Sequence, residues 1–389
     1  MVANPSFKAM MNEVVAYGSC CECGSCVLVC PHNVIDYIDG KPKQVAKASA
    51  AFDYCGISEG IGCDVCAQVC PRLNPREFEL ADLLFGEDQP MKGAFGVHRR
   101  VVAARCTDHA ILERAQDGGV VTAMLLWAFE RGLIDGAAVS VADPDHPAHP
   151  IPTIVTSADA MRASAGSWYT YCPNNLALAD AERLGLERVA FVGVPCQITP
   201  VRKMQLVDAA YLDNGRKKEK HIERQSKFLK GYGSRVALTI GLLCTEVFTY
   251  DGLMVEKIQG DMGIPLGDIK KFNVKGKVLI YKKDGSLVEM KLKEAQEYAR
   301  PECHHCGDFS AELADISCGG VGAMDWTITI LRTPRGEELF DRMVADGLFE
   351  VRPIEEFEKS MKVLLRLTNK QHLRVPVPPG QDAARVRAV

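Results

Sequence analysis

A run of four cysteines near the start of the chain constrains its fold more than any other feature. The run is spaced C-x2-C-x2-C-x3-C and is followed at once by Pro31, and its end recurs before Pro71 with one more cysteine upstream. In bacterial-type ferredoxins the last cysteine of such a run ligates the other of two [4Fe–4S] clusters. The pattern therefore predicts one cluster on Cys20, Cys23, Cys26 and Cys70, and another on Cys30, Cys55, Cys63 and Cys66.

Zinc is the main alternative, because C-x2-C pairs also bind it. Zinc takes four ligands, usually as two separated pairs, and needs neither a third cysteine nor one before a proline. The second run is less regular, since seven residues separate Cys55 from Cys63. This glycine-rich segment is flexible enough to loop out and return the thiolate. Cys21 is surplus, and we expect it to be an unligated neighbour. Two linked clusters indicate single-electron transfer.

Composition narrows the class of protein further. Of 389 residues, 47% are hydrophobic and 25% charged, which is ordinary for a globular protein. The net charge of −4 offers no case for nucleic acid as a partner. Sixteen cysteines in a long chain without a visible signal peptide indicate metal ligands in a reducing cytoplasm. The apolar stretches 120–129 and 236–244 are about half of a bilayer span, so we expect any membrane association to be peripheral, through a partner complex.

The expected fold class is α+β, with two main parts. Residues 1–80 form the two-cluster ferredoxin module, 81–96 a linker, 97–335 an α/β domain, and 336–389 a helical extension and tail. Within the α/β domain, 116–141 reads as a glycine turn, a helix and a strand. Buried strands are expected at 188–196 and 235–244. Alternating residues at 272–292 predict a hairpin that turns at Asp284-Gly285.

Two of these strands end at a cysteine, and ligands gather at the carboxyl ends of strands in open α/β sheets. Cys196 and Cys244 lie at these ends, and Cys303 and Cys306 lie in a cysteine- and glycine-rich loop. The four thiols are candidates for a third [4Fe–4S] cluster. The alternative is that they are small buried hydrophobic residues, which is also the reading we favour for Cys106, Cys172 and Cys318.

Five segments of the chain resemble the coenzyme F420 hydrogenase/dehydrogenase beta-subunit family, and the resemblance spans about 95–335. With a ferredoxin module in front, the layout is most similar to the electron-input subunits of archaeal F420H2 dehydrogenase complexes. One departure is Cys318, where many relatives have an aliphatic residue. The segments are QDGGVVTAML (116–125), VGVPCQ (192–197), GLLCTEVF (241–248), FNVKGK (272–277) and RPECHHCGDFSAELADISCGGVG (300–322).

The resemblance implies an α/β domain that binds FAD and a [4Fe–4S] cluster, the latter at the third set of cysteines. It implies an oxidoreductase subunit that exchanges hydride between coenzyme F420 and FAD and passes single electrons through its clusters to or from partner redox subunits. Hydride transfer between flavins needs no protein acid, so no catalytic residue is expected. Three alternatives stay open: an F420-reducing subunit of a hydrogenase, formate dehydrogenase or heterodisulfide reductase assembly, a flavin and iron–sulfur reductase of a small organic substrate, and an electron-transfer adaptor without its own activity.

Several residues are candidates for cofactor contacts. Helix-start N–H groups after a glycine turn suit a phosphate, although a plain helix entry is equally open. The phosphate and oligoglutamate tail of F420 require cations, for which the charged run 214–231 is a further candidate, with a solvated or partner-docking helix as its alternatives. His304 and His305 are candidates for handling a proton. The predicted contacts are Gly118, Gly119 and Thr122 for the phosphate, Ser167, Trp168 and Tyr169 for the ring, Lys275 and Lys277 near the flavin, and Arg202 and Lys203 for F420.

Overall fold

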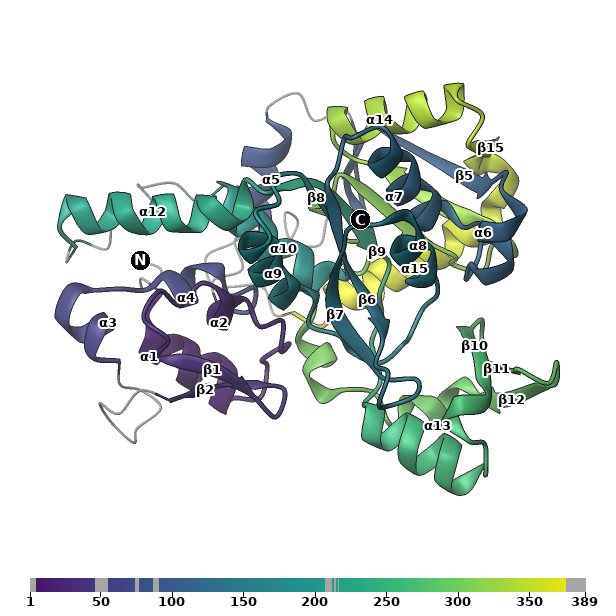
Figure 1. Ribbon diagram of the computed structural model, residues 1–389, viewed down its shortest axis with the longest axis horizontal. Coiled ribbons are helices and arrows are strands. Elements are labelled where there is room, and N and C mark those ends of the chain that lie inside the picture. Colours follow the sequence, from purple (N-terminus) through teal and green to yellow (C-terminus); the bar gives the residue numbers. More distant parts are fainter. Residues whose placement is uncertain are drawn as a thin grey trace.

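The computed structural model describes residues 5–45, 55–73, 77–86, 91–206, 212, 215 and 217–375, and the fold is mixed α and β as expected (Figure 1). The Pro- and Arg-rich tail, part of the linker and the start of the charged run fall outside these ranges. No helix within the described ranges is long and apolar enough to cross a membrane.

Residues 5–45 and 55–73, which we call the N-terminal module, consist of short elements packed around cysteines. Each cysteine run enters a helix, so that Cys26 lies in α2 and Cys66 in α4, and the two strands pair antiparallel. Phe7, Met10 and Met11 complete a small core with these thiols. The elements are α1 (Phe7–Ala9), η1 (Met10–Ala16), α2 (Ser25–Leu28), β1 (Ile35–Ile38), β2 (Lys41–Gln44), α3 (Gly56–Ile61) and α4 (Val65–Val69), followed by α5 (Glu77–Phe85).

The rest of the chain, which we call the α/β domain, is built on an eight-stranded mixed sheet of order β15-β5-β14-β13-β9-β8-β6-β7. The centre is parallel, from β6 through β8 and β9 to β13, and the outer pairs are antiparallel. The strands are β5 (Arg100–Cys106), β6 (Gly136–Ala142), β7 (Pro150–Val155), β8 (Val189–Gly193), β9 (Val236–Leu242), β13 (Ile316–Gly319), β14 (Thr327–Leu331) and β15 (Phe349–Pro353).

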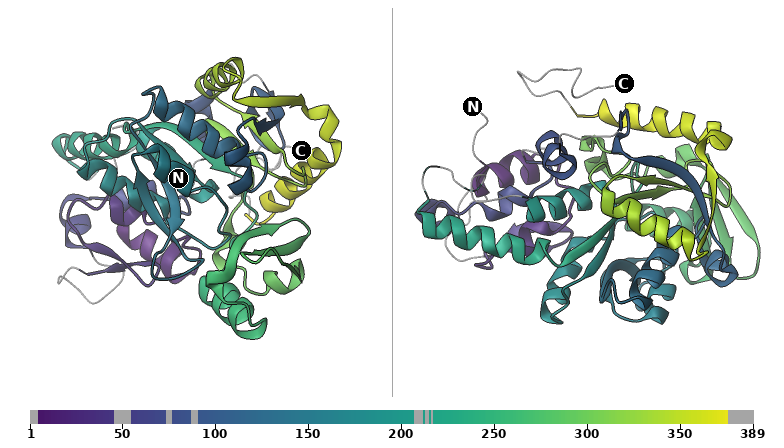
Figure 2. Two further views of the ribbon diagram at one scale, coloured as in Figure 1. Left: turned by 45° about the vertical axis from the view of Figure 1, so that its right-hand side comes forward. Right: turned by 90° about the horizontal axis from the view of Figure 1, so that it is seen from above.

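Helices cover both faces of this sheet, because successive side chains of a strand point to opposite sides. On β8, Ala190 and Val192 join one core cluster, while Val189 and Phe191 join another. The first cluster packs against α7 (Val120–Glu130) and α14 (Pro334–Ala345), and Figure 2 shows α15 (Glu358–His372) on the face opposite α14. The remaining helices are α6 (His109–Arg114), α8 (Ala158–Ala163), η2 (Asn174–Leu176), α9 (Ala177–Arg183), α10 (Pro195–Leu206), α12 (Glu219–Gly233), η5 (Pro301–His305) and η6 (Ile354–Phe357), and β3 (Met91–Gly93) pairs with β4 (Gly96–His98).

A small lobe projects from the α/β domain and has its own apolar core (Figure 1). Its three-stranded antiparallel sheet contains the expected hairpin, which turns at Asp284-Gly285 with Gly285 at φ +85°. The lobe comprises η3 (Tyr250–Asp261), η4 (Leu266–Asp268), β10 (Ile269–Val274), β11 (Lys277–Lys282), β12 (Leu287–Lys291) and α13 (Leu292–Gln296).

The N-terminal module shares an apolar core with the α/β domain and is docked firmly against it. Val29 and Val69 of the module belong to the same buried cluster as Leu178, Ile198 and Met204. The approach is close at Gly24, where an added Cβ would lie 2.5 Å from the Leu176 side chain. Burial of this kind makes the relative position of the two parts a property of the fold.

The C-terminal segment differs from the helical extension expected from residue 336 onward. Gly347, at φ +75°, follows the end of α14, and residues 349–353 then form β15, which pairs antiparallel with β5 at the edge of the main sheet. The exposed backbone of an edge strand attracts a neighbouring strand. The C-terminal extension is therefore partly integrated into the main sheet.

Candidate functional site

The carboxyl ends of the parallel strands bring cysteine-bearing loops to one edge of the main sheet. β8 and β9 pair in parallel up to Gly193 and Gly241, after which Cys196 opens α10 and Cys244 follows β9. The Leu243 N–H donates to the Cys318 carbonyl at 3.0 Å and ties the second loop to β13. This is the position at which α/β sheets gather ligands.

Five thiols line one cavity at this edge. Cys196 and Cys244 come from the strand ends, Cys303 and Cys306 from η5 and its end, and Cys21 reaches in from the N-terminal module. Burial raises the pKa of the Cys244 thiol, and the neighbouring Cys303 and Cys306 raise it further. A thiolate in this cavity therefore needs a compensating positive charge, which the iron of a cluster supplies.

Buried cationic and polar groups surround the same cavity. Arg72, from just after the second cysteine run, donates to the His305 carbonyl at 2.5 Å, and its Nε is buried without a hydrogen-bond partner among the described residues. The Arg300 guanidinium lies 4.2 Å from the centroid of the Tyr171 ring, and the Tyr171 hydroxyl is likewise buried without a partner in that part of the chain. Orphaned buried donors are costly, and an anionic cluster with its thiolates satisfies them.

A second cavity lies wholly within the N-terminal module. Its lining includes Cys30, Cys55, Cys63 and Cys66, the four predicted for the second ferredoxin cluster, among apolar side chains. The Val34 N–H donates to the Cys30 sulfur at 3.3 Å, and such bonds to sulfur tune the potentials of iron–sulfur clusters. The arrangement fits the predicted ligand set.

The remaining predicted set adjoins the second. Burial raises the pKa of Cys26, and the nearby thiols of Cys20 and Cys70 raise it further. Cys20, Cys26 and Cys70 of the first set share one buried core cluster with Cys55 and Cys66 of the second set. The first and second sets are therefore neighbours within the N-terminal module.

No group of three or more His, Cys, Asp or Glu side chains in the described part of the chain is arranged to hold a metal ion as it stands. A [4Fe–4S] cube makes a different demand, because its four thiolates attach at separate corners of an inorganic core. Thiols spread around a cavity suit that demand better than thiols converging on one point.

The glycine turn predicted for a phosphate lies at the same edge of the sheet. Gly119, at φ +70°, precedes α7, and no side chain caps that helix. Gly118 packs against the backbone, where an added Cβ would lie 2.5 Å from the Ala104 carbonyl oxygen. This close packing is enough to explain why residue 118 is a glycine. The uncapped start of α7, beside the half-buried Thr122, is available to an anion.

Tyr169 lies against this turn in a strained backbone conformation. Its φ of +58° is unusual for a bulky residue. Gln116 donates to the Tyr169 hydroxyl at 3.2 Å and to the Phe272 carbonyl at 3.0 Å, so the turn, the 167–171 loop and the small lobe meet here. Burial raises the pKa of Tyr169 to about 12. The half-buried Trp168 has an indole N–H with no partner among the described residues, and Ser167 precedes it.

Lys275 connects the small lobe to the glycine turn. Its Nζ lies 2.6 Å from an Asp117 carboxylate oxygen, and both side chains are largely buried. Burial raises the pKa of Asp117 despite this partner. Lys277 is different: it is exposed and pairs with Glu289 across the hairpin at 2.7 Å. The structure brings Lys275, and not Lys277, to the turn.

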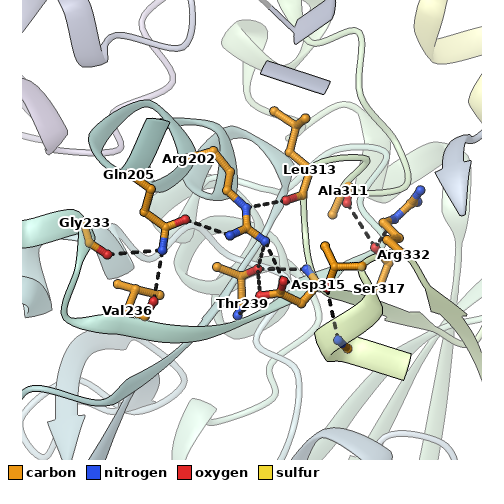
Figure 3. Close-up of polar contacts among 12 residues, drawn as sticks. Arg202, Gln205, Gly233, Val236, Thr239, Ala311, Leu313, Asp315, Ser317 and Arg332 are labelled. Atoms are coloured by element: carbon orange, nitrogen blue, oxygen red, sulfur yellow. Dashed lines mark hydrogen bonds and ion pairs between the residues drawn. The ribbon is translucent and has the colours of Figure 1, made fainter. Parts of the chain in front are cut away.

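Arg202 and Lys203 have structural partners. Arg202 is buried and lies 3.0 Å from Asp315, which also bonds Thr239 (Figure 3). Burial alone would raise the pKa of Asp315, but Arg202 and the Thr239 bonds hold it below its usual value. Lys203, fully buried, donates to the Cys70 carbonyl at 2.7 Å. The F420 contacts predicted for Arg202 and Lys203 find no support in this arrangement, and both stay outside the site proposed below.

The other candidates are dispersed. From Glu219 onward the charged run forms α12, whose buried Ile222 and Leu229 pack inward while its charges face solvent. Lys217, just before the helix, is buried and lies 2.5 Å from an Asp64 carboxylate oxygen. His304 is exposed, and His305 contacts the Tyr17 ring edge-on. Cys106, Cys172 and Cys318 are buried and line neither cysteine cavity.

Sequence reasoning missed three residues that matter here, Arg72, Tyr171 and Asp117, and expected Cys21 to be an unligated neighbour. Cys21, Arg72 and Tyr171 line the cavity at the sheet edge, which we call the third cavity because it contains the third predicted set of cysteines. Asp117 pairs with Lys275. The sequence carries only weak local indications of these residues: Arg72 directly follows Cys70-Pro71, and Asp117 directly precedes the double glycine.

Thiols gathered beside the carboxyl edge of a sheet, together with a ferredoxin-like cysteine module, are typical of iron–sulfur proteins. The chain belongs to the family described as coenzyme F420 hydrogenase/dehydrogenase, beta subunit, whose N-terminal part matches 101–179 and whose C-terminal part matches 186–357. The resemblance expected from the sequence is thereby confirmed.

Individual relatives agree with this membership. The coenzyme F420 hydrogenase subunit beta of Methanosarcina barkeri is 36% identical over 71% of this chain and 89% of its own length. An F420H2 dehydrogenase subunit of Methanosarcina mazei is 31% identical, with 86% of this chain and 85% of the relative covered. The coenzyme F420-dependent sulfite reductase of Methanocaldococcus jannaschii is 33% identical over 94% of this chain, which spans about half (52%) of that relative.

A solved structure also matches. A chain in the F420-reducing [NiFe] hydrogenase complex from Methanosarcina barkeri superposes with a TM-score of 0.63 at 34% identity, covering 72% of this chain and 90% of that one.

Proposed function

We propose that this protein is an F420-dependent oxidoreductase subunit that exchanges hydride between coenzyme F420 and FAD and moves single electrons through three [4Fe–4S] clusters to or from partner redox subunits. When bound, FAD supplies the conversion between two-electron and one-electron chemistry, and the clusters carry single electrons. The proposal extends the names of the relatives to this chain's own residues.

The observation that carries the proposal is the serial arrangement of the three cysteine sets. The second set adjoins the first, because Cys55 and Cys66 share one buried cluster with Cys20, Cys26 and Cys70. Cys21, the peptide neighbour of Cys20, lines the cavity of the third set together with Cys196 and so connects the first set to the third. Thiols that serve only as small buried side chains do not need to follow one another from the module to the sheet edge. Ligands of clusters that exchange electrons do, because each cluster must lie close to the next.

The chain's own residues have distinct tasks in this proposal. The uncapped start of α7 after Gly118 and Gly119 receives a phosphate of FAD. Tyr169 and Trp168 flank the ring, and Lys275 offers a cation beside it. The three cysteine sets bind the clusters. Packing between the turn, the 167–171 loop and the small lobe excludes water from the reacting rings.

Two alternative functions would use the same residues. The same subunit in a hydrogenase or formate dehydrogenase assembly would reduce F420, and only the partner distinguishes the two directions. The sulfite reductase supports a third arrangement, because about half of it is similar to nearly all of this chain and the other half has no counterpart in the aligned part. In that arrangement the electrons pass to an acceptor unit that reduces an inorganic oxyanion, on the same polypeptide or on a partner.

Anaerobic mixing of FAD-reconstituted protein with F420H2, and separately with NADH, tests the proposal. Flavin bleaching by F420H2 alone, followed by reduction of a viologen dye, is expected. A protein that holds FAD but is not bleached by F420H2 would overturn the proposal and favour a reductase of a small organic substrate. A protein that holds clusters but no FAD would favour an electron-transfer adaptor.

A further inference from the structure

The third cavity has one cysteine more than a [4Fe–4S] cluster requires. Besides Cys196, Cys244, Cys303 and Cys306, it is lined by Cys21. Cys21 is the peptide neighbour of Cys20, a proposed ligand of the first cluster. It lines the cavity together with Cys196 and is itself buried, at 4% exposure. Cys21 is therefore joined through the backbone to a proposed ligand of the first cluster and shares a cavity with the proposed ligands of the third.

The next residue fixes Cys21 in this place. Glu22 adopts a left-handed conformation with φ +63°, which is strained for a residue with a side chain. Its carboxylate lies 2.5 Å from Arg300 and 2.9 Å from Lys41, and its carbonyl accepts from the Tyr37 hydroxyl at 2.8 Å. These contacts connect the module to the loop before Cys303, so the backbone at Cys21 is fastened to both sides of the cavity.

We propose that Cys21 is not a cluster ligand but the bridge for electron transfer between the third cluster and the first. Electron tunnelling falls steeply across through-space gaps, so a residue that is bonded to one ligand set and lines the cavity of the other would shorten the weakest part of the path. With both clusters bound, Cys21 would lie on the route of one electron at a time, and no bond to Cys21 would form or break. This inference rests on the proposed function.

The polar environment of the cavity suits this assignment. Arg72 comes from the module, as Cys21 does, and contributes a buried guanidinium to the cavity at a carbonyl beside Cys306. The third site is thus completed across the interface between the two parts of the chain. A path that crosses here needs a group from the module beside the third cluster's ligands, and Cys21 meets that requirement.

The test uses the complete, reconstituted protein and two substitutions, Cys21→Ala and Cys21→Ser, with Cys106→Ala as a matched control. Cys106 is a buried thiol in β5 that lines neither cysteine cavity. We would measure iron and sulfide per chain, the electron paramagnetic resonance signals of the clusters, and the rate at which the ferredoxin-type signals appear after mixing with F420H2, followed by freeze-quenching.

Cys21→Ala is expected to keep the full iron content and the rate of flavin bleaching but to slow reduction of the ferredoxin-type clusters severalfold. Cys21→Ser should be intermediate, because its hydroxyl fills part of the space of the thiol and leaves a longer gap, and Cys106→Ala should match the unmodified protein. An unchanged rate in Cys21→Ala would overturn the bridge. Loss of the third cluster's iron would overturn it as well, by making Cys21 a ligand. An unmodified protein that lacks the third cluster or does not react with F420H2 would refute the proposed function itself, and the bridge with it.

Discussion

Arg300 of the α/β domain and Glu22 of the N-terminal module form an ion pair with an Nη2–Oε2 distance of 2.5 Å. Both side chains are mostly buried, at 6% and 16% exposure. The same guanidinium stacks on Tyr171, which lines the third cavity. One arginine thus links the first cysteine run, the docking of the module and the proposed third cluster.

Arg300→Gln should weaken the docking of the N-terminal module. Removing Arg300 takes away the more buried of the two cations at Glu22, which keeps Lys41 at 2.9 Å, and leaves the Tyr171 ring without its guanidinium. We expect a cost of about 2 kcal/mol, as for the loss of a hydrogen bond to a charged group. The urea concentration at which cluster absorbance is lost should therefore fall clearly. Arg352→Gln is the control, because Arg352 forms an exposed pair with Glu350 and such pairs contribute about 0–1 kcal/mol. Equal midpoints for the two variants would contradict the proposed role of Arg300.

Cys196→Ala should remove the third cluster and leave the two ferredoxin-type clusters in place. A cubane cluster with three of its four thiolates is less stable, whereas the other two sets are untouched. Iron and sulfide per chain, with resonance spectra of the reduced protein, measure this. Cys172→Ala, at a buried thiol outside both cysteine cavities, is the control. An unchanged iron content in Cys196→Ala would show that this residue is not a ligand.

Cys23→Ala should separate the input of electrons from their exit. The first cluster lies on the path between the third set and the second, so its loss interrupts that path while the flavin region is unaffected. Bleaching of the flavin by F420H2 should continue, and electron delivery to an isolated partner subunit or to a large dye-linked acceptor should fall. Delivery at the original rate would remove the N-terminal module from the path.

Lys275→Met should weaken FAD binding, with Lys277→Met as the matched control two residues away. Lys275 lies at the glycine turn beside Asp117, and its loss leaves a buried carboxylate without its cation. We expect the dissociation constant for FAD to rise about tenfold, which corresponds to about 1.4 kcal/mol. Lys277 is exposed and pairs with Glu289, so its substitution should change little. The constants follow from titration of the apoprotein monitored by flavin fluorescence, and equal values for the two variants would argue against the proposed flavin site.

Stability should fall as the pH rises above neutrality because of His372. Burial would lower the pKa of His372, but the hydrogen bond to Glu312, 2.9 Å from Nε2, together with the negative charges of Glu312 and Asp308 outweighs burial and raises it. A raised pKa means that this stabilisation is complete below the unfolded value of about 6.5 and is lost as the pH passes the folded value. Asp308, whose burial raises its pKa to about 7, also lowers stability as the pH rises, but over the range from its usual value of about 3.9 up to about 7.

His372→Gln separates the two contributions, because it should flatten the dependence of the urea midpoint on pH without abolishing it. His372 ends α15, and the neighbouring Arg374 donates to the Thr245 carbonyl at 2.7 Å, beside Cys244. An identical pH profile in the variant would show that the pair does not hold the end of this helix.

Much of the fold was predictable from local patterns. The helix after the double glycine, the buried strands before Cys196 and Cys244, and the hairpin at Asp284-Gly285 all appear where periodicity and turn chemistry place them. The exception is β15, whose five residues cannot be told from a break between helices without knowing that β5 leaves an edge open.

The sequence by itself determined family membership, because the matching segments are contiguous in the chain. It also carries the prediction of the cluster type, because the spacing of cysteines before Pro31 and Pro71 is a local property of the chain. Tertiary structure alone decided which groups meet across the molecule. Packing of the module against α10 brings Cys21 and Arg72 to the cavity at the sheet edge and buries Lys203 against the Cys70 carbonyl. Within the α/β domain, Asp315 and the Leu313 carbonyl hold Arg202 in the interior, and on the small lobe Lys277 stays in solvent. Contacts of this kind depend on the packing of side chains that are distant in sequence, and the local spacing of residues does not predict them.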